Sequence, residues 1–250
     1  MISTNGQRAL CSHEKFFDGL FIFFVLASLT ACSSPDAVND KIIKDPYPLS
    51  KEHLCEPSEQ GEAKQLALDL FKEAEQLRAK GDDINSVPIW RNIIEIDPNF
   101  NCAIYELAQA LRRIGEYDDA IHHYDSAIGK GPTPWYYFYS RGAAKYLAGY
   151  YQDAVIDLSP AIALNPGEPT IYDLRADSKI MQNNYIGAFD DIELAIAKGG
   201  LYPKVLKTRG ILYAMRKEWN HACSDWQTII SNYNQSNEHK AANDLLREYC

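Results

Sequence analysis

The sequence predicts an all-α solenoid: five helix–turn–helix units of 34 residues each, followed by a C-terminal capping helix. The first observation is a column of isoleucines spaced 34 residues apart, namely Ile94, Ile128, Ile162, Ile196 and Ile230. The second and third are that small residues and bulky apolar residues recur with the same period. Such a period is typical of repeat proteins, in which each unit buries its apolar face against the next.

The repeat columns indicate how the two helices of a unit pack. The eighth position is small, in Ala74, Ala108, Gly142, Ala176 and Gly210, and so is the twentieth, in Ser86, Ala120, Ala154, Ala188 and Ala222. The twenty-fourth position is bulky, in Trp90, Tyr124, Leu158, Ile192 and Trp226. Small residues let two helices approach closely, and the bulky residue fills the space beside the next unit. The repeats are expected over residues 62–234, and the register divides them into units 67–100, 101–134, 135–168, 169–202 and 203–236.

Glycine, asparagine and proline mark the expected helix ends. The first helix of a unit should end in a left-handed residue, for which glycine and asparagine are suited. The residues at this point are Gly81, Gly115, Gly149 and Asn183. Pro88 fits the first turn of a helix capped by Asn85 or Ser86. Pro160 lies inside a second helix, where it removes a backbone hydrogen bond, so we expect a kink or break there. Residues 237–250 form an amphipathic stretch that should cap the last unit.

Together these columns resemble the tetratricopeptide repeat (TPR), whose unit is a pair of antiparallel helices. The resemblance implies a concave groove lined by residues of the first helix of each unit, where partner proteins or peptides bind. The residues carried over to this groove are Tyr105, Gln109, Arg112, Arg113, Tyr136, Tyr139, Tyr146, Asp173, Asp177, Lys204 and Lys207. Tyrosine suits an interface anchor because it combines a large rigid surface with a hydroxyl. Arg112 and Arg113 would attract acidic groups; the alternative is that the tyrosines pack on neighbouring helices.

The N-terminus reads as a targeting segment. Residues 19–30 are uncharged and mostly apolar, too short to span a bilayer but long enough for the core of a signal peptide. They end in Leu29, Thr30, Ala31 and Cys32, which resemble the bacterial lipobox. The resemblance implies cleavage of residues 1–31, a lipid on Cys32, and a flexible tether over residues 32–61. The alternative is a buried apolar helix in which the cysteine packs as a small hydrophobic residue.

The residue after the lipidated cysteine bears on the compartment. Ser33 stands where an aspartate would favour retention at the inner membrane in Gram-negative lipoproteins. The resemblance therefore implies the outer membrane, with the protein facing the periplasm, if the cell has two membranes.

The cysteines fit an oxidising compartment. Outside the signal peptide and the lipidated residue, four remain: Cys55, Cys102, Cys223 and Cys250. An even number in an exported protein suggests two disulfides. The expected stacking favours pairing Cys55 with Cys102 and Cys223 with Cys250; the alternative is four buried free thiols.

Composition and motifs favour a binding protein over an enzyme. The net charge of −9, without a block of lysine or arginine, argues against a nucleic-acid partner. Asp118, Asp119, His122 and His123 are spaced to form two Asp–His pairs on a helix, but two ligands are too few for a closed metal site, so we assign no metal and no cofactor.

The sequence therefore predicts a non-catalytic, lipid-anchored TPR scaffold that binds proteins of the bacterial envelope. A pilotin-like factor for assembling a pilus or secretion-system component in the outer membrane is an alternative function. A cryptic enzyme is a weaker one, because the chain leaves little room for a second domain beyond the repeats, tether and cap.

Overall fold

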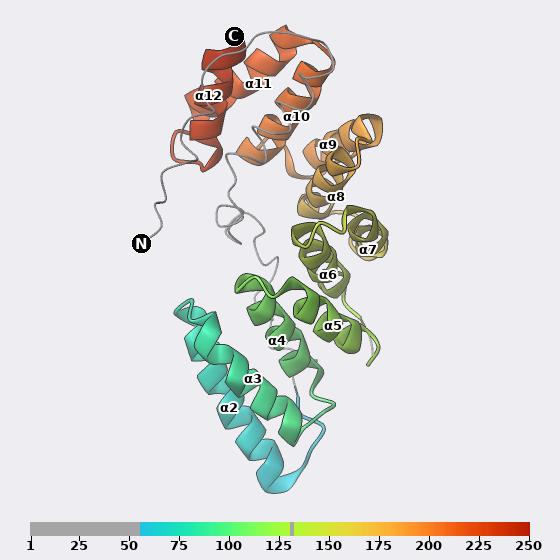
Figure 1. The fold of residues 1–250 in the computed structure, drawn as a ribbon, viewed down its shortest axis with the longest axis vertical. Helices are drawn as coiled ribbons and strands as arrows, with labels where there is room; N and C mark the ends of the chain where they lie inside the picture. Colours follow the sequence, from blue (N-terminus) through green and yellow to red (C-terminus); the bar gives the residue numbers. More distant parts are fainter. Residues whose placement is uncertain (1–55, 131–132) are drawn as a thin grey trace, which may run out of the picture. The chain divides into compact units, whose positions relative to one another are not determined.

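The five predicted helix pairs are all present in the structure, a computed structural model that describes residues 56–130 and 133–250 (Figure 1). The described residues form eleven helices and no strand, which confirms the all-α fold. The first helices of the units, here called the A helices, are α2 (Gly61–Ala79), α4 (Asn101–Arg113), α6 (Trp135–Leu147), α8 (Pro169–Met181) and α10 (Pro203–Met215). The second helices, called the B helices, are α3 (Asp83–Ile96), α5 (Tyr117–Ile128), α7 (Tyr151–Leu164), α9 (Tyr185–Gly199) and α11 (Trp219–Asn232), and α12 (Glu238–Tyr249) follows them.

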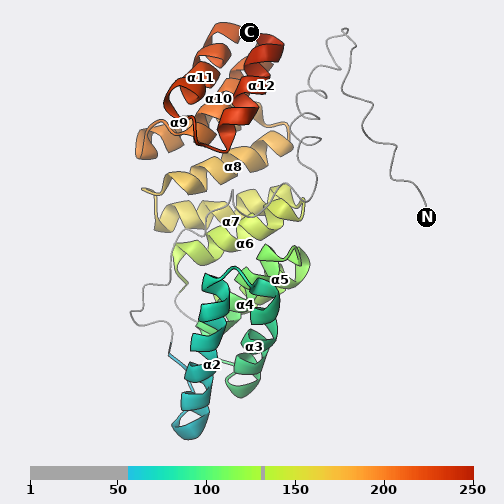
Figure 2. The ribbon, with the colours of Figure 1, turned by 90° about the vertical axis from the view of Figure 1, so that its left-hand side faces the viewer.

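The helices stack in chain order, each against the one before it and the one after it (Figures 1 and 2). Helices α4 and α6 also touch each other directly, as do α6 and α8, so A helices of successive units lie side by side. The final helix, α12, contacts both α10 and α11. It therefore takes the place that a sixth A helix would occupy, and it covers the end of the stack as a cap should.

The repeat columns form the interior. Every residue at the small twentieth position and every bulky residue at the twenty-fourth is at most 1% exposed. The isoleucines that reveal the period are only half-buried. The fully buried side chains are those one residue earlier: Ile93, Ala127, Ala161, Ala195 and Ile229. The isoleucine column therefore flanks the core, and the residue before it lies at the contact between helices.

Each A helix ends in the same hydrogen-bonded turn. Gly81, Gly115, Gly149 and Asn183 have positive φ, which confirms the predicted helix ends, and Lys217 takes the same conformation in the fifth unit. The following residue bonds back across the turn each time, as Asp82 N does to the Leu77 carbonyl at 2.9 Å. This is the six-to-one bond of a Schellman motif, and it sets the reversal from A helix to B helix.

The structure differs from the sequence-based expectations in the place of Pro88 and in the absence of a break at Pro160. Helix α3 begins at Asp83, after Asp82 accepts the Asn85 N–H, so Pro88 lies inside the helix instead of in its first turn. Helix α7 continues through Pro160 to Leu164 without a break. The carbonyl that loses its donor there belongs to Ile156, a residue on the exposed side of the helix.

The end of the predicted tether is attached to the first unit. Ser58 and Glu59 donate backbone hydrogen bonds to the Asp97 carboxylate, and the Ser58 hydroxyl donates a third. Burial opposes ionisation of Asp97, but these bonds outweigh it and lower its pKa. Residues 56–60 thus belong to the folded part. The signal peptide, Cys32, Cys55 and the rest of the tether lie outside the described residues and stay predictions.

The C-terminal cap is held covalently and by aromatic packing. Cys223 and Cys250 form a disulfide with a Cα–Cα distance of 6.0 Å, which is the pairing predicted from the sequence. The ring of Tyr249 stacks on that of Trp219, with centroids 5.7 Å apart. The disulfide therefore joins the last B helix to the end of α12. Cys102 is buried in α4, and its pairing with Cys55 stays a prediction.

Removing the C-terminal disulfide should loosen the cap. We expect Cys223→Ser to lower the free energy of unfolding by about 2 kcal/mol, at the low end for disulfides because Trp219 and Tyr249 still hold α12. Urea denaturation followed by circular dichroism measures this, and Ser224→Ala, at a neighbouring position, is the control. An unchanged free energy of unfolding in Cys223→Ser would show that the disulfide contributes nothing to stability.

None of the helices from α2 to α12 combines the length and the apolar content needed to cross a bilayer.

Candidate partner-binding face

The predicted groove residues lie on α4, α6, α8 and α10, and we call the surface that these residues form the A-helix face. The structure gathers them into two groups. One group, on α4 and α6, is built around Tyr105; the other, on α6, α8 and α10, is built around Asp173 and Lys204.

Tyr105 is packed between units. It is 4% exposed, its ring lies parallel to that of Tyr137 at a centroid distance of 4.3 Å, and its hydroxyl lies 2.9 Å from Ser140 Oγ. Tyr136 meets the same ring edge-on at 5.6 Å. Tyr105 therefore links α4 to α6, which corresponds to the packing alternative and differs from the open anchor expected from the sequence.

Gln109 connects this tyrosine to its neighbours. Its side-chain N–H donates to the Tyr105 hydroxyl at 3.1 Å, while its carbonyl accepts from Arg112 Nε at 3.3 Å and from the Tyr124 hydroxyl. Gln109 is 3% exposed and Arg112 2%. The two side chains thus form part of a buried polar network in which every bond constrains the others.

Arg113 has an acidic partner within the chain. Its Nη2 lies 2.9 Å from Asp83 Oδ1, so it ties α4 to the start of α3. The sequence had suggested that Arg112 and Arg113 attract acidic groups of a partner. Instead, Arg112 is buried and Arg113 makes an ion pair within the repeat stack.

The second group, which we call the Asp173–Lys204 cluster, consists of Asp173, Asp177, Lys204, Tyr139, Tyr146 and Tyr202. Lys204 Nζ lies 2.8 Å from Asp173 Oδ2 and 3.0 Å from Asp177 Oδ2. Asp173 is 2% exposed, and burial raises the pKa of its carboxyl to about 6 although Lys204 opposes this. Burial alone would lower the pKa of Lys204, but the two carboxylates outweigh it and hold that pKa well above its usual value.

The tyrosines of this cluster stay neutral. Burial raises the pKa of Tyr139 to about 12, and it also raises the pKa values of Tyr146 and Tyr202. Asp177 adds to the effect at Tyr146 and Asp173 to that at Tyr202, so the three rings lie within the field of the carboxylates. Tyr139 is 4% exposed, whereas Tyr146, Asp177, Lys204 and Lys207 are half-buried. The second group therefore reaches solvent at these last four residues, as the first group does at Arg113 and Tyr136.

A third feature, an Arg–Asp ladder, repeats in the last three units and was missed from the sequence. Each rung pairs an A-helix arginine with a B-helix aspartate sixteen residues later through two hydrogen bonds: Arg141 with Asp157, Arg175 with Asp191, and Arg209 with Asp225. The donor–acceptor distances are 2.6 to 2.9 Å. The sequence does contain a signal for this ladder: the seventh position of the repeat is arginine and the twenty-third is aspartate in each of these three units.

The ladder also connects neighbouring units. Arg141 reaches back to Asp125 of the preceding B helix at 2.7 Å, and Arg209 to Glu193 at 3.5 Å. The corresponding positions of the second unit hold Leu107 and His123. The second unit therefore lacks the residues that form a rung of the ladder.

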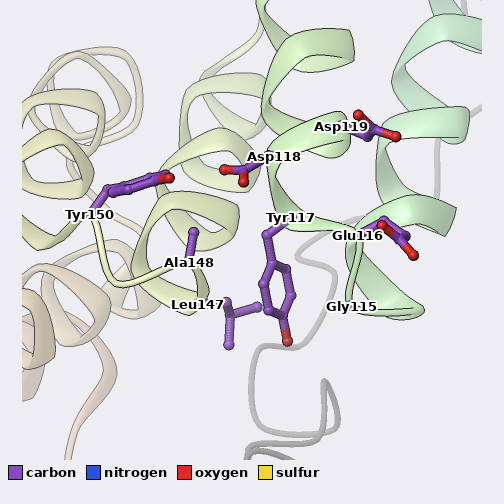
Figure 3. A pocket seen from close by; sticks show the side chains of 8 residues that line it. All are labelled: Gly115, Glu116, Tyr117, Asp118, Asp119, Leu147, Ala148 and Tyr150. Carbon is purple, nitrogen blue, oxygen red and sulfur yellow. The ribbon is translucent and has the colours of Figure 1, made fainter.

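A pocket of about 490 Å³, lined by none of the predicted groove residues named above, lies between the turn that precedes α5 and the turn that follows α6 (Figure 3). Glu116, Asp118 and Asp119 line one side, and Leu147 and Tyr150 line the other. A hydrogen bond with Asp118 raises the pKa of Tyr150. No group of three or more potential metal-binding side chains occurs within residues 56–130 and 133–250.

Antiparallel helix pairs of 34 residues, with small residues at the crossings and a buried bulky residue at the twenty-fourth position, define a TPR solenoid. Comparison with solved structures gives the same class. Over 72% of this chain and 99% of theirs, the fold is similar to that of MamA from Desulfovibrio magneticus RS-1, with a TM-score of 0.65 and 14% identity. It is also similar to a tetratricopeptide repeat protein from Parabacteroides merdae, with a TM-score of 0.64, 18% identity and 72% of each chain covered.

A third similar structure is YrrB, described as a TPR protein with an unusual peptide-binding site. The TM-score is 0.58 at 15% identity, covering 72% of this chain and 92% of YrrB. Comparisons with protein-family models and with curated proteins gave no match. At these identities the comparisons establish the fold, and the described part of this chain has the tetratricopeptide-repeat fold.

Proposed function

We propose that this protein is a non-catalytic scaffold that binds a protein or peptide partner through the A-helix face and is anchored to the bacterial envelope by a lipid on Cys32. The observation that carries the binding role is the Asp173–Lys204 cluster, in which three consecutive A helices contribute aromatic and charged side chains to one place. Proteins of this fold typically mediate protein–protein interactions, and YrrB, which shares the fold, has a peptide-binding site. The lipobox supports the anchor, and Ser33 supports the outer membrane.

Site-specific photocrosslinking in the producing cell tests the binding role. Lys207→p-benzoylphenylalanine places the crosslinker at a half-buried position of the A-helix face, and Glu193→p-benzoylphenylalanine places it on an exposed B-helix position as the matched control. We expect a discrete crosslinked protein from position 207 that is absent from position 193. Equal products from both positions, or none from position 207, would contradict the use of this face.

The anchor is tested separately with Cys32→Ser. We expect the natural sequence to fractionate with membranes and to carry the mass of acyl chains on its N-terminal peptide, because several acyl chains together give stable anchoring. The variant should lose both properties. If the unsubstituted protein carries no lipid, the anchor is wrong while the binding role stands. The crosslinked partner also decides the pilotin-like alternative, which requires an outer-membrane component of a pilus or secretion system.

A further inference from the structure

Two buried polar atoms of the Asp173–Lys204 cluster lack a hydrogen-bond partner within the described residues: Asp173 Oδ1 and Tyr202 Oη. The other oxygen of Asp173 makes the ion pair with Lys204, so one half of the carboxylate is satisfied and the other is not. A buried carboxylate oxygen without a donor costs free energy, because it has lost water and gained nothing in return. Both atoms are hydrogen-bond acceptors that the described residues leave without a donor.

The charges of the cluster favour a cationic donor. Asp173 and Asp177 share a single ammonium group, that of Lys204, so the carboxylates outnumber it. Lys207 lies one turn further along α10 and makes no ion pair with a described carboxylate, although its charge acts on Asp173 from a distance. Ionised carboxylates in a site of low dielectric attract a second cation strongly.

The cluster is also reachable and lined by aromatic rings. The side chains of Asp177 and Lys204 each keep 19% of their surface exposed, so solvent meets the cluster on that side. Tyr139, Tyr146 and Tyr202, whose pKa values burial raises, are close enough to the carboxylates for the charge of Asp173 or Asp177 to raise those pKa values further, and neutral aromatic rings of this kind can attract cations. Lys204 already places an alkylammonium group among them, which shows that the surroundings tolerate this chemistry.

We propose that the Asp173–Lys204 cluster binds the cationic side chain of a lysine or arginine in a partner peptide, which pairs with the carboxylates of Asp177, at the solvent-exposed side, and Asp173. This inference rests on the proposed function and specifies the ligand chemistry of the same face. It assigns recognition to carboxylates on α8, where the sequence had pointed to Arg112 and Arg113 on α4 and therefore to acidic ligands.

Selection from a random dodecapeptide display library on the full chain tests the proposal. We expect selected peptides to share a lysine or arginine at one position. A synthetic peptide of that sequence should bind Asp177→Asn about tenfold or more weakly than it binds the natural chain, since breaking a close charge pair at an interface has an effect of this size. Glu193→Gln removes an equal charge from an exposed B-helix position and should leave the affinity unchanged.

A second measurement leaves the protein untouched. The same synthetic peptide carrying Nε-acetyl-lysine or citrulline at the shared position should also bind about tenfold or more weakly. The peptide comparison tests the role of the cationic side chain even if Asp177→Asn impairs folding. Circular dichroism shows whether that variant is folded. Selected peptides without a shared cation, or an acetylated peptide that binds as well as the original, would overturn this inference and leave the proposed function in place. If no peptide is selected, this inference falls, and the crosslinking experiment at position 207 still decides the proposed function.

Discussion

Arg175→Leu should destabilise the protein by about 3–5 kcal/mol, the largest effect we expect from a single substitution. Arg175 donates two hydrogen bonds to Asp191, at 2.9 and 2.6 Å, and Asp191 is 1% exposed. Without the guanidinium, a buried carboxylate keeps only Lys179, whose Nζ lies 2.7 Å away. The cost comes from leaving buried charge poorly compensated. Urea denaturation followed by circular dichroism measures the free energy of unfolding.

The chain offers both a control and a rescue for this substitution. Glu193→Gln removes the outer, 47%-exposed carboxylate near Arg209 and should change the free energy of unfolding by less than about 0.5 kcal/mol. Arg175→Leu combined with Asp191→Leu should recover much of the loss, because an apolar pair replaces the ionic one. The second unit already holds Leu107 at the position of the arginine. A loss below about 1 kcal/mol in Arg175→Leu would show that the rung contributes little to stability.

Gly210→Ala should destabilise the protein by about 3 kcal/mol because the site has no room for a methyl group. A Cβ at this position would lie 2.8 Å from Trp226 Cδ1 and 2.9 Å from its Cε2, and closer still to Nε1. Trp226 is 1% exposed and cannot move aside without disturbing the packing of α10 on α11. The measurement is again urea denaturation, supported by tryptophan fluorescence, to which Trp226 contributes.

Gly142→Ala is the matched control in the same repeat column. There a Cβ would meet Leu158 at 3.2 and 3.3 Å, a smaller overlap with a more adaptable side chain. We expect a loss below about 1 kcal/mol. Adding Trp226→Leu to Gly210→Ala should cost less than the two single losses summed, since the smaller side chain removes the clash. Equal losses at Gly142 and Gly210 would refute this account.

Much of the fold could be predicted because stacked units must solve the same packing problem in the same way. Ala74 and Trp90 in the first unit are buried at the positions of Gly210 and Trp226 in the last. The ends of the A helices could be predicted from the sequence equally well, because a left-handed backbone conformation restricts the residue type. Lys217 was missed because only its place in the repeat, and not its side chain, points to that conformation.

The binding face was harder to predict because a residue's place in the repeat does not determine its exposure. Tyr105 holds a groove position, yet a tyrosine and a serine of the next unit cover it. The burial of Tyr105 depends on neighbours that belong to other columns of the repeat. The same is true of the ion pair between Arg113 and Asp83, and of the lack of a hydrogen-bond donor at Asp173 Oδ1. Sequence periodicity gives the position of a side chain on its helix, whereas its hydrogen-bond partners depend on the particular residues of adjacent units.

The bond between Cys223 and Cys250 has a mechanical consequence. It spans 27 residues, so under tension the segment between them cannot be drawn out, and roughly 90 Å of contour length stays hidden at about 3.4 Å per residue. A chain held at its N-terminus and pulled from the other end would lengthen by unravelling the units that precede Cys223. Force spectroscopy would register the difference as a shorter final extension in oxidising than in reducing buffer.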